Sequence, residues 1–274
     1  MFGYCFDLAL RSFKHNKVLM GLIAVAISAA GLFPVVHARA HDAIDGADQL
    51  VVVTTTTWNS VSGRLQRFER HGSGDGWKAI GQPFPIVVGK TGLAWGDGLI
   101  TNERLGAEAG DPIKHEGDGK APAGVFALGT AFGYEPKPLV GSRMSYVHLT
   151  PSVECVDDTK SQYYNRIVDR QNVNAPDWSS SEHMLRDDEL YHWGVYVDHN
   201  ANPVKPGGGS CIFLHVWRGA GQGTVGCTAM PMEDIQQLIT WFDPKKSPLL
   251  VQMPRGQYDK LRKHLKLPEL ATTE

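Results

Sequence analysis

The sequence lacks the short motifs of several familiar hydrolases. It contains no Ser-x-x-Lys and no Gly-x-Ser-x-Gly, so it offers neither the serine of penicillin-binding proteins nor an α/β-hydrolase nucleophile elbow. It also contains no His-Glu-x-x-His and no closely spaced zinc ligands, which argues against a metalloprotease or a zinc finger. His192 and His199 flank one predicted strand beside Asp198. A metal site there is conceivable, but polar residues at a strand end are the simpler interpretation.

The chain has no surplus of basic charge. Its 274 residues include 27 Lys and Arg against 29 Asp and Glu, a net charge of −2, so general electrostatic attraction to nucleic acid is excluded. Glycine (30 residues) and proline (16) are frequent, which favours a fold rich in turns and loops over a helical bundle. The length suits one large domain or two small ones, and it suffices to bury a substantial core.

A hydrophobic run without charge occupies residues 18–36, after a basic start and before Ala38-Arg39-Ala40. This pattern predicts a secretory signal peptide over residues 1–40. The alternative is an uncleaved membrane anchor, since the run is long enough to span a bilayer. Either interpretation places the remainder outside the cytoplasm, in the periplasm or cell envelope. Without residues 1–40 the net charge becomes −5 and three cysteines remain, an odd number in an oxidising compartment.

The remaining chain is predicted to be mainly β. Residues 41–49 are interpreted as a polar leader, 50–253 as the catalytic domain and 254–274 as a helical tail. β-Branched or alternating segments predict strands at residues 50–57, 65–70, 85–89, 125–128, 191–198 and 211–216. Ile235, Leu238, Ile239 and Phe242 have helical spacing, and a second helix is expected over 257–266. The polar segment 153–190 is expected to be an elaborated surface loop.

The candidate chemistry lies at His215 and Cys227. His215 ends an apolar strand, a glycine-rich loop follows, and Cys227 stands after Gly226 ahead of the first helix. A thiol nucleophile needs a base within hydrogen-bond reach, and such a pair forms best as thiolate and imidazolium. Gly226 leaves the backbone bare, so nearby amides could bind an oxyanion. The alternative is a structural or disulfide-bonded cysteine beside an ordinary strand histidine.

The other two cysteines of the exported chain, Cys155 and Cys211, lie in polar contexts. If they form a disulfide, Cys227 is the remaining free thiol. Such a bond would also hold the long 156–210 segment beside the His215 strand.

These residues resemble the L,D-transpeptidase catalytic domain family (YkuD-type). The resemblance rests on Phe213-Leu214-His215 with Gly226-Cys227, and on 120–126 (KAPAGVF), which is similar to that family's T-P-x-G-x-F segment. It covers roughly residues 50–253. Thr224 matches the family's Ser/Thr. Val225 stands where a second histidine is common, Ala229 where Arg or Asn is usual, and the spacer is short, which indicates a divergent branch.

The resemblance implies a β-sandwich or barrel with a long polar insertion and short C-terminal helices. It also implies an enzyme in which Cys227 attacks a peptidoglycan tetrapeptide stem, releases D-Ala and forms a thioester, with His215 moving protons. An amine then resolves the thioester to form a cross-link, or water does so in an L,D-carboxypeptidase. No metal or organic cofactor is implied. The expected partner is the peptidoglycan stem peptide, with no nucleic acid and no membrane contact beyond residues 1–40, and the enzyme is expected to be a monomer.

Substrate contacts are expected from the polar segment and from the residues after the base, named here as Tyr164, Asn165, Arg166, Trp217 and Arg218. Papain-like and NlpC/P60-like enzymes place cysteine before histidine, the reverse of the order here. Sortases have a wider His–Cys spacing and a T-L-x-T-C motif. A wall-binding domain with a dead site is a third possibility, which the intact His215 and Cys227 disfavour.

Overall fold

The structure, a computed structural model, describes residues 44–271. The predicted signal segment lies outside the described residues. Within the described part of the chain, no helix combines the length and apolar character needed to cross a bilayer. The elements in chain order are β1 (Gln49–Thr55), β2 (Ser62–Glu69), β3 (Lys78–Val87), β4 (Leu93–Trp95), β5 (Ala121–Gly133), β6 (Tyr146–His148), β7 (Val153–Val156), β8 (Ile167–Asp169), η1 (Arg170–Asn172), β9 (Ser181–His183), η2 (Glu189–Tyr191), β10 (Trp193–Val197), β11 (Phe213–Val216), β12 (Thr228–Met230), α2 (Met232–Trp241), η3 (Pro244–Lys246), β13 (Leu249–Pro254) and α3 (Arg255–Leu261).

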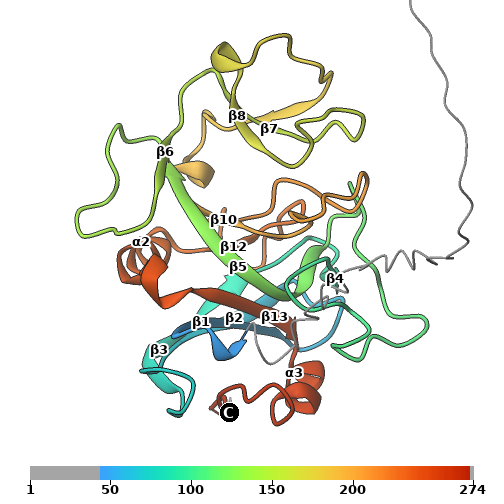
Figure 1. Ribbon diagram of the computed structural model, residues 1–274, viewed down its shortest axis with the longest axis vertical. Helices are drawn as coiled ribbons and strands as arrows, with labels where there is room; N and C mark the ends of the chain where they lie inside the picture. Colours follow the sequence, from blue (N-terminus) through green and yellow to red (C-terminus); the bar gives the residue numbers. More distant parts are fainter. Residues whose placement is uncertain (1–43, 272–274) are drawn as a thin grey trace, which may run out of the picture. The chain divides into compact units, whose positions relative to one another are not determined.

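Eight of the described strands close into a mixed barrel (Figure 1). Their order is β10-β11-β12-β3-β2-β1-β13-β5, and β5 returns to pair with β10. Closure leaves no free edge along this path, and the long β5 also pairs with the short strands β4 and β6. The predicted mainly β fold with a barrel and two short C-terminal helices is confirmed.

The helix α2 follows from its sequence. In α2, Ile235, Leu238 and Ile239 are buried, and Glu233 and Asp234 lie in the first turn, where the helix dipole favours acids. The helix packs against β10 and β11. The second helix, expected over 257–266, instead begins directly after Pro254 and spans Arg255–Leu261.

The sequence interpretation expected the polar segment 153–190 to be a surface loop, but the segment also forms regular structure. It contains a three-stranded sheet of order β8-β7-β9, which we call the cap sheet. Every residue of β7 is buried. Glu154 is among them, and its carboxylate accepts hydrogen bonds from Arg170, Trp178 and Ser181. The polar composition is therefore satisfied inside the segment, which hides the strand from a pattern of hydrophobicity alone.

Two clusters of buried side chains hold the fold. The main core fills the barrel and includes Leu214 and Val216 of β11. A second core joins the barrel wall to the cap sheet, and its members are Phe132, Leu149, Val153, Cys155, Met184, Tyr191, Cys211, Phe213 and Cys227. Ile44 and Ala47, from the segment interpreted as a polar leader, are also fully buried in the main core.

Candidate active site

His215 lies in β11 and Cys227 directly precedes the neighbouring strand β12, and the two side chains face the same side of the barrel wall. β11 and β12 pair in parallel, with His215 opposite Ala229. Because side chains alternate between the two faces of a strand, Cys227, two residues before Ala229, shares the face of His215. Phe213 also lies on this face, in the second core. Both candidate catalytic side chains line one cavity.

The thiol of Cys227 is held by the backbone. Its residue is 3% exposed. The Phe213 N–H donates to Sγ at 3.3 Å, and Sγ donates to the Cys211 carbonyl at 3.5 Å. Burial raises the pKa of the Cys227 thiol, and the nearby Glu182 carboxylate raises it further. These surroundings therefore favour the neutral thiol of Cys227.

The environment of His215 favours a neutral imidazole. Its Nδ1 lies 2.7 Å from the Val216 carbonyl oxygen. Because a carbonyl only accepts, Nδ1 carries the hydrogen and Nε2 keeps its lone pair. Burial lowers the pKa of His215 to about 4. The ring of Tyr191 meets the imidazole edge-on, with centroids 5.2 Å apart.

These two environments change one expectation. The sequence argument expected the pair to form best as thiolate and imidazolium, but burial disfavours the charged form of each group. The described resting state thus contains a neutral thiol and a neutral imidazole.

Thr224 organises the loop that precedes Cys227. Its N–H donates to the Val88 carbonyl at 3.0 Å, and its carbonyl accepts from the Lys90 N–H at 2.7 Å. Its Oγ1 donates to the Cys227 carbonyl at 2.6 Å and accepts from the Gly226 N–H at 3.1 Å. The Gly226 amide, predicted to bind an oxyanion, is thus occupied by Thr224 at rest and would have to be released to serve in that role.

The cavity above the thiol has a volume of about 370 Å³. Trp217 and Arg218, predicted to contact substrate, are among the residues that line it. The full lining consists of Glu182, Arg186, Leu190, Tyr191, His215, Trp217, Arg218, Gln222, Gly223, Thr224, Val225, Cys227 and Ala229. The wall is therefore built from β9 and the following segment through η2 on one side, and from residues 215–229 on the other.

The structure does not bring Tyr164, Asn165 or Arg166 to this cavity. Tyr164 and Asn165 are buried elsewhere, and Arg166 is exposed. Asn165 Oδ1 accepts from the Cys211 N–H at 2.9 Å, and its Nδ2 donates to the backbone carbonyls of residues 199 and 200. Asn165 thus positions the chain that enters β11, because it bonds directly to the residue whose carbonyl receives the thiol.

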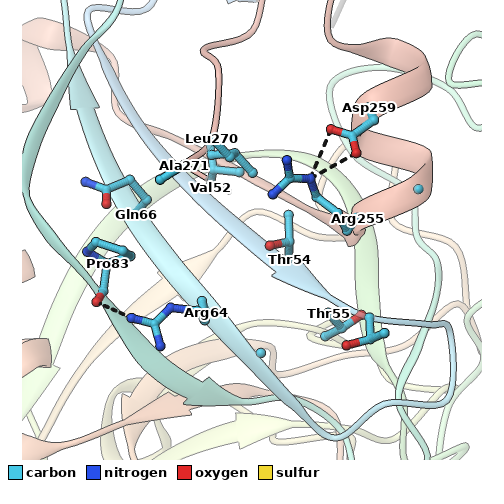
Figure 2. A pocket seen from close by; sticks show the side chains of 13 residues that line it. Val52, Thr54, Thr55, Arg64, Gln66, Pro83, Arg255, Asp259, Leu270 and Ala271 are labelled. Carbon is cyan, nitrogen blue, oxygen red and sulfur yellow. Dashed lines mark hydrogen bonds and ion pairs between the residues drawn. The ribbon is translucent and has the colours of Figure 1, made fainter. Parts of the chain in front are cut away.

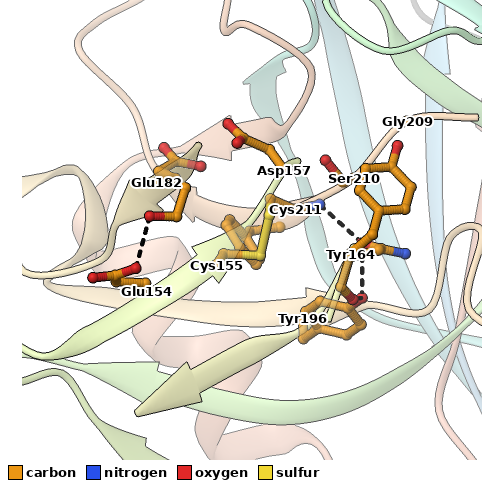
Figure 3. Close-up of a disulfide and its surroundings, with 12 residues drawn as sticks. Glu154, Cys155, Asp157, Tyr164, Glu182, Tyr196, Gly209, Ser210 and Cys211 are labelled. Carbon is orange, nitrogen blue, oxygen red and sulfur yellow. Dashed lines mark hydrogen bonds between the residues drawn. A yellow bond between two sulfur atoms is a disulfide. The ribbon is translucent and has the colours of Figure 1, made fainter. Parts of the chain in front are cut away.

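The disulfide between Cys155 and Cys211 is present, as the sequence predicted (Figure 3). It joins the central strand of the cap sheet to the segment just before β11 and leaves Cys227 as a buried free cysteine. Cys155 is also opposite Glu182 in the β7–β9 register. The bond therefore holds the cap sheet, including Glu182, against the barrel wall that carries the thiol.

Sequence reasoning missed three residues of the cavity wall, Glu182, Arg186 and Tyr191. The Tyr191 hydroxyl donates to Glu182 Oε1 at 2.5 Å, and the Arg186 guanidinium lies 5.3 Å from the centroid of the Tyr191 ring. The available signal was weak, because β9 is only three residues long and carries no hydrophobic alternation. The pairing of β9 with β7 places Glu182 at the cavity, and the segment from β9 to η2 brings Arg186 and Tyr191 beside it.

A larger cavity, of about 620 Å³, lies beside β1, β2 and α3 (Figure 2). Figure 2 shows Arg255 paired with Asp259 and Arg64 bonded to the Pro83 carbonyl. The residues that line it include no cysteine or histidine. This cavity offers no nucleophile and base, so size alone does not identify the candidate active site.

The two histidines around β10 do not form a metal site. His192 Nδ1 lies 2.6 Å from Glu189, and His199 donates to the Gly208 carbonyl. Across residues 44–271, no group of three or more His, Cys, Asp or Glu side chains is arranged to hold a metal ion.

Comparison with known proteins gave one match. The family model described as "L,D-transpeptidase catalytic domain" (YkuD) matches residues 74–251. This range contains the cap sheet, His215 and Cys227. No curated protein and no solved structure matched the chain.

Proposed function

Because this chain belongs to the YkuD family of L,D-transpeptidase catalytic domains, we propose that it is an L,D-transpeptidase with Cys227 as nucleophile. The proposed donor is a peptidoglycan tetrapeptide stem. The observation that carries the proposal is the placement of His215 in β11 and of Cys227 directly before the parallel strand β12, on one face and at one cavity inside the matched range. Val225 and Ala229 differ from the residues usual in the family motif, but His215 and Cys227 themselves match it.

The first half-reaction exchanges an amide for a thioester. Nε2 of His215 takes the thiol proton while Sγ attacks the carbonyl carbon of the third stem residue. The C–N bond to D-Ala then breaks, and the imidazolium returns the proton to the departing amine. Because both groups start neutral, the ion pair exists only during the reaction, when the substrate has displaced water from the cavity.

The second half-reaction distinguishes two activities. An amine that attacks the thioester forms a cross-link or an exchanged stem, whereas water forms a tripeptide and makes the enzyme an L,D-carboxypeptidase. Trp217 and Arg218 are proposed to contact the peptide, since both line the cavity beside the thiol. No cofactor is required by either step.

The proposed location is the periplasm or cell envelope. The predicted signal segment and the Cys155–Cys211 disulfide support it, because disulfides persist in oxidising compartments. The substrate is also found there. We propose that the enzyme acts as a monomer.

The test is incubation of the protein with a disaccharide-tetrapeptide, followed by mass spectrometry. We expect loss of D-Ala and formation of a dimer, and both should disappear in Cys227→Ala at unchanged thermal stability. Loss of D-Ala without dimer identifies the carboxypeptidase, and equal activity of Cys227→Ala would refute the mechanism. A carbapenem should also form a covalent adduct on Cys227, as the family resemblance implies.

A further inference from the structure

Glu182 is the one acidic side chain among the described residues that line the Cys227 cavity. It comes from β9 of the cap sheet, and its side chain is 24% exposed. Tyr191 connects it to the catalytic face, because the Tyr191 hydroxyl bonds to Glu182 while the Tyr191 ring packs on His215. Its charge therefore acts directly on the reaction site.

The two arginines at the cavity bind a second carboxylate more closely than they bind Glu182. Arg186 forms two hydrogen bonds of 2.9 Å with Asp188, whereas its nearest contact with Glu182 is 3.8 Å. Arg218 also faces Asp188, at 3.7 Å. Both arginines thus face Asp188, a carboxylate outside the cavity lining, and Glu182 has the longer ion pair with Arg186 but no hydrogen bond from a cation among the described residues.

The position of Glu182 hinders the first half-reaction. A carboxylate near Sγ disfavours the thiolate, because like charges repel strongly in a partly buried site. Glu182 is therefore a poor aid to attack by Cys227. A function in the second half-reaction does not carry this cost, since the thioester sulfur is uncharged.

We propose that Glu182 binds the ammonium group of the acyl acceptor and removes one of its protons before the amine attacks the thioester. This inference rests on the proposed transpeptidase function. An amine is a cation at neutral pH and cannot attack until it loses a proton. Burial raises the pKa of Glu182, while the Tyr191 hydrogen bond and Arg186 oppose the rise, so this carboxylate is a stronger base than an exposed one.

The protons of this step balance. Of the three ammonium protons, one passes to Glu182, one remains on the new amide nitrogen, and one reaches the departing Cys227 sulfur through His215. The C–N bond forms as the C–S bond breaks. Because Glu182 is then neutral, it no longer disfavours the leaving thiolate, and it later releases its proton to water.

The experiment compares the wild-type enzyme with Glu182→Gln. Glu189→Gln is the matched control, because Glu189 lies in η2 near Tyr191 but contacts His192, outside the cavity. The enzymes receive the tetrapeptide donor with either glycine methyl ester, a cationic acceptor, or hydroxylamine, which is uncharged at neutral pH. Release of D-Ala in a single turnover measures acylation, and mass spectrometry gives the ratio of transfer to hydrolysis.

We expect Glu182→Gln to release D-Ala at least as fast as the wild type. Its ratio of transfer to hydrolysis with the cationic acceptor should fall by about a hundredfold or more, the scale of a lost general base, while hydroxylamine transfer stays unchanged. The control should behave as the wild type. An unchanged ratio, or an equal loss with both acceptors, overturns the role of Glu182. Absence of D-Ala release from the wild type overturns the proposed function itself and this inference with it.

Discussion

Removal of the Cys155–Cys211 disulfide should destabilise the protein and loosen the cap sheet. The perturbation is the double variant Cys155→Ala/Cys211→Ala, which leaves Cys227 unchanged. The bond joins residues 56 apart in sequence. For a closed loop of that length, the chain-entropy model gives a stabilisation of about 4 kcal/mol at 25 °C. In a domain of this size, that corresponds to a fall in Tm of roughly 10 °C.

The loss of stability should be larger in the cap sheet than in the barrel. The barrel closes without the disulfide, through its own strand pairing, but the cap sheet has only three strands, and two of them have three residues each. The chain just before β11 should stay in place, since the side chain of Asn165 still accepts a hydrogen bond from the backbone N–H of residue 211. Hydrogen exchange should therefore rise in β7–β9 and remain slow in β1, β2 and β13.

The assay is guanidinium unfolding together with hydrogen exchange read by mass spectrometry. The matched control is Cys227→Ala, which removes a buried sulfur and no cross-link. A loss of unfolding free energy below about 1 kcal/mol, or unchanged protection of the cap sheet, would refute the view that this bond holds the cap sheet on the barrel.

Two further predictions concern the buried histidines and the loop before the nucleophile. His215 and His199 each have a pKa lowered by burial to about 4, below the ordinary value near 6.5, so the unfolded chain binds more protons in acid. The contribution of each neutral histidine to the free energy of unfolding should thus be fully present above pH 6.5 and should fall as the pH drops toward 4, by up to roughly 3 kcal/mol for each histidine. Guanidinium unfolding at pH 7.5 and at pH 4.5 measures this loss. His199→Gln should reduce the dependence of the unfolding free energy on pH. Thr224→Val should lower the rate of carbapenem adduct formation about tenfold and the unfolding free energy by about 1 kcal/mol, because its hydroxyl holds the Cys227 carbonyl and the Gly226 amide. Thr224→Ser keeps the hydroxyl and should retain the wild-type rate, and equal rates for Val and Ser would contradict the role of the hydroxyl.

Local features of the sequence were sufficient for much of the fold. The β-branched segment at 50–57 forms β1, and the apolar spacing from Ile235 to Ile239 forms α2, because strand and helix periodicity are properties of neighbouring residues. The odd number of cysteines after residue 40, with their local contexts, indicated the Cys155–Cys211 bond and the free thiol at Cys227. The spacing of His215 and Gly226-Cys227 indicated the family.

The surroundings of that pair depended on the tertiary structure. The polar segment 153–190 gave no sign that β9 would pair with β7, because the pairing joins residues far apart in the chain and involves mostly polar side chains. That pairing places Glu182 at the cavity, and the separate turn between β7 and β8 carries Asn165, which bonds to the backbone at the entry to β11. Burial, which depends on every neighbouring element, decided that Cys227 and His215 rest uncharged. The sequence by itself thus determined the candidate pair His215 and Cys227 and the β-rich segments around it, whereas long-range packing decided which charge state is favoured and which groups face the pair.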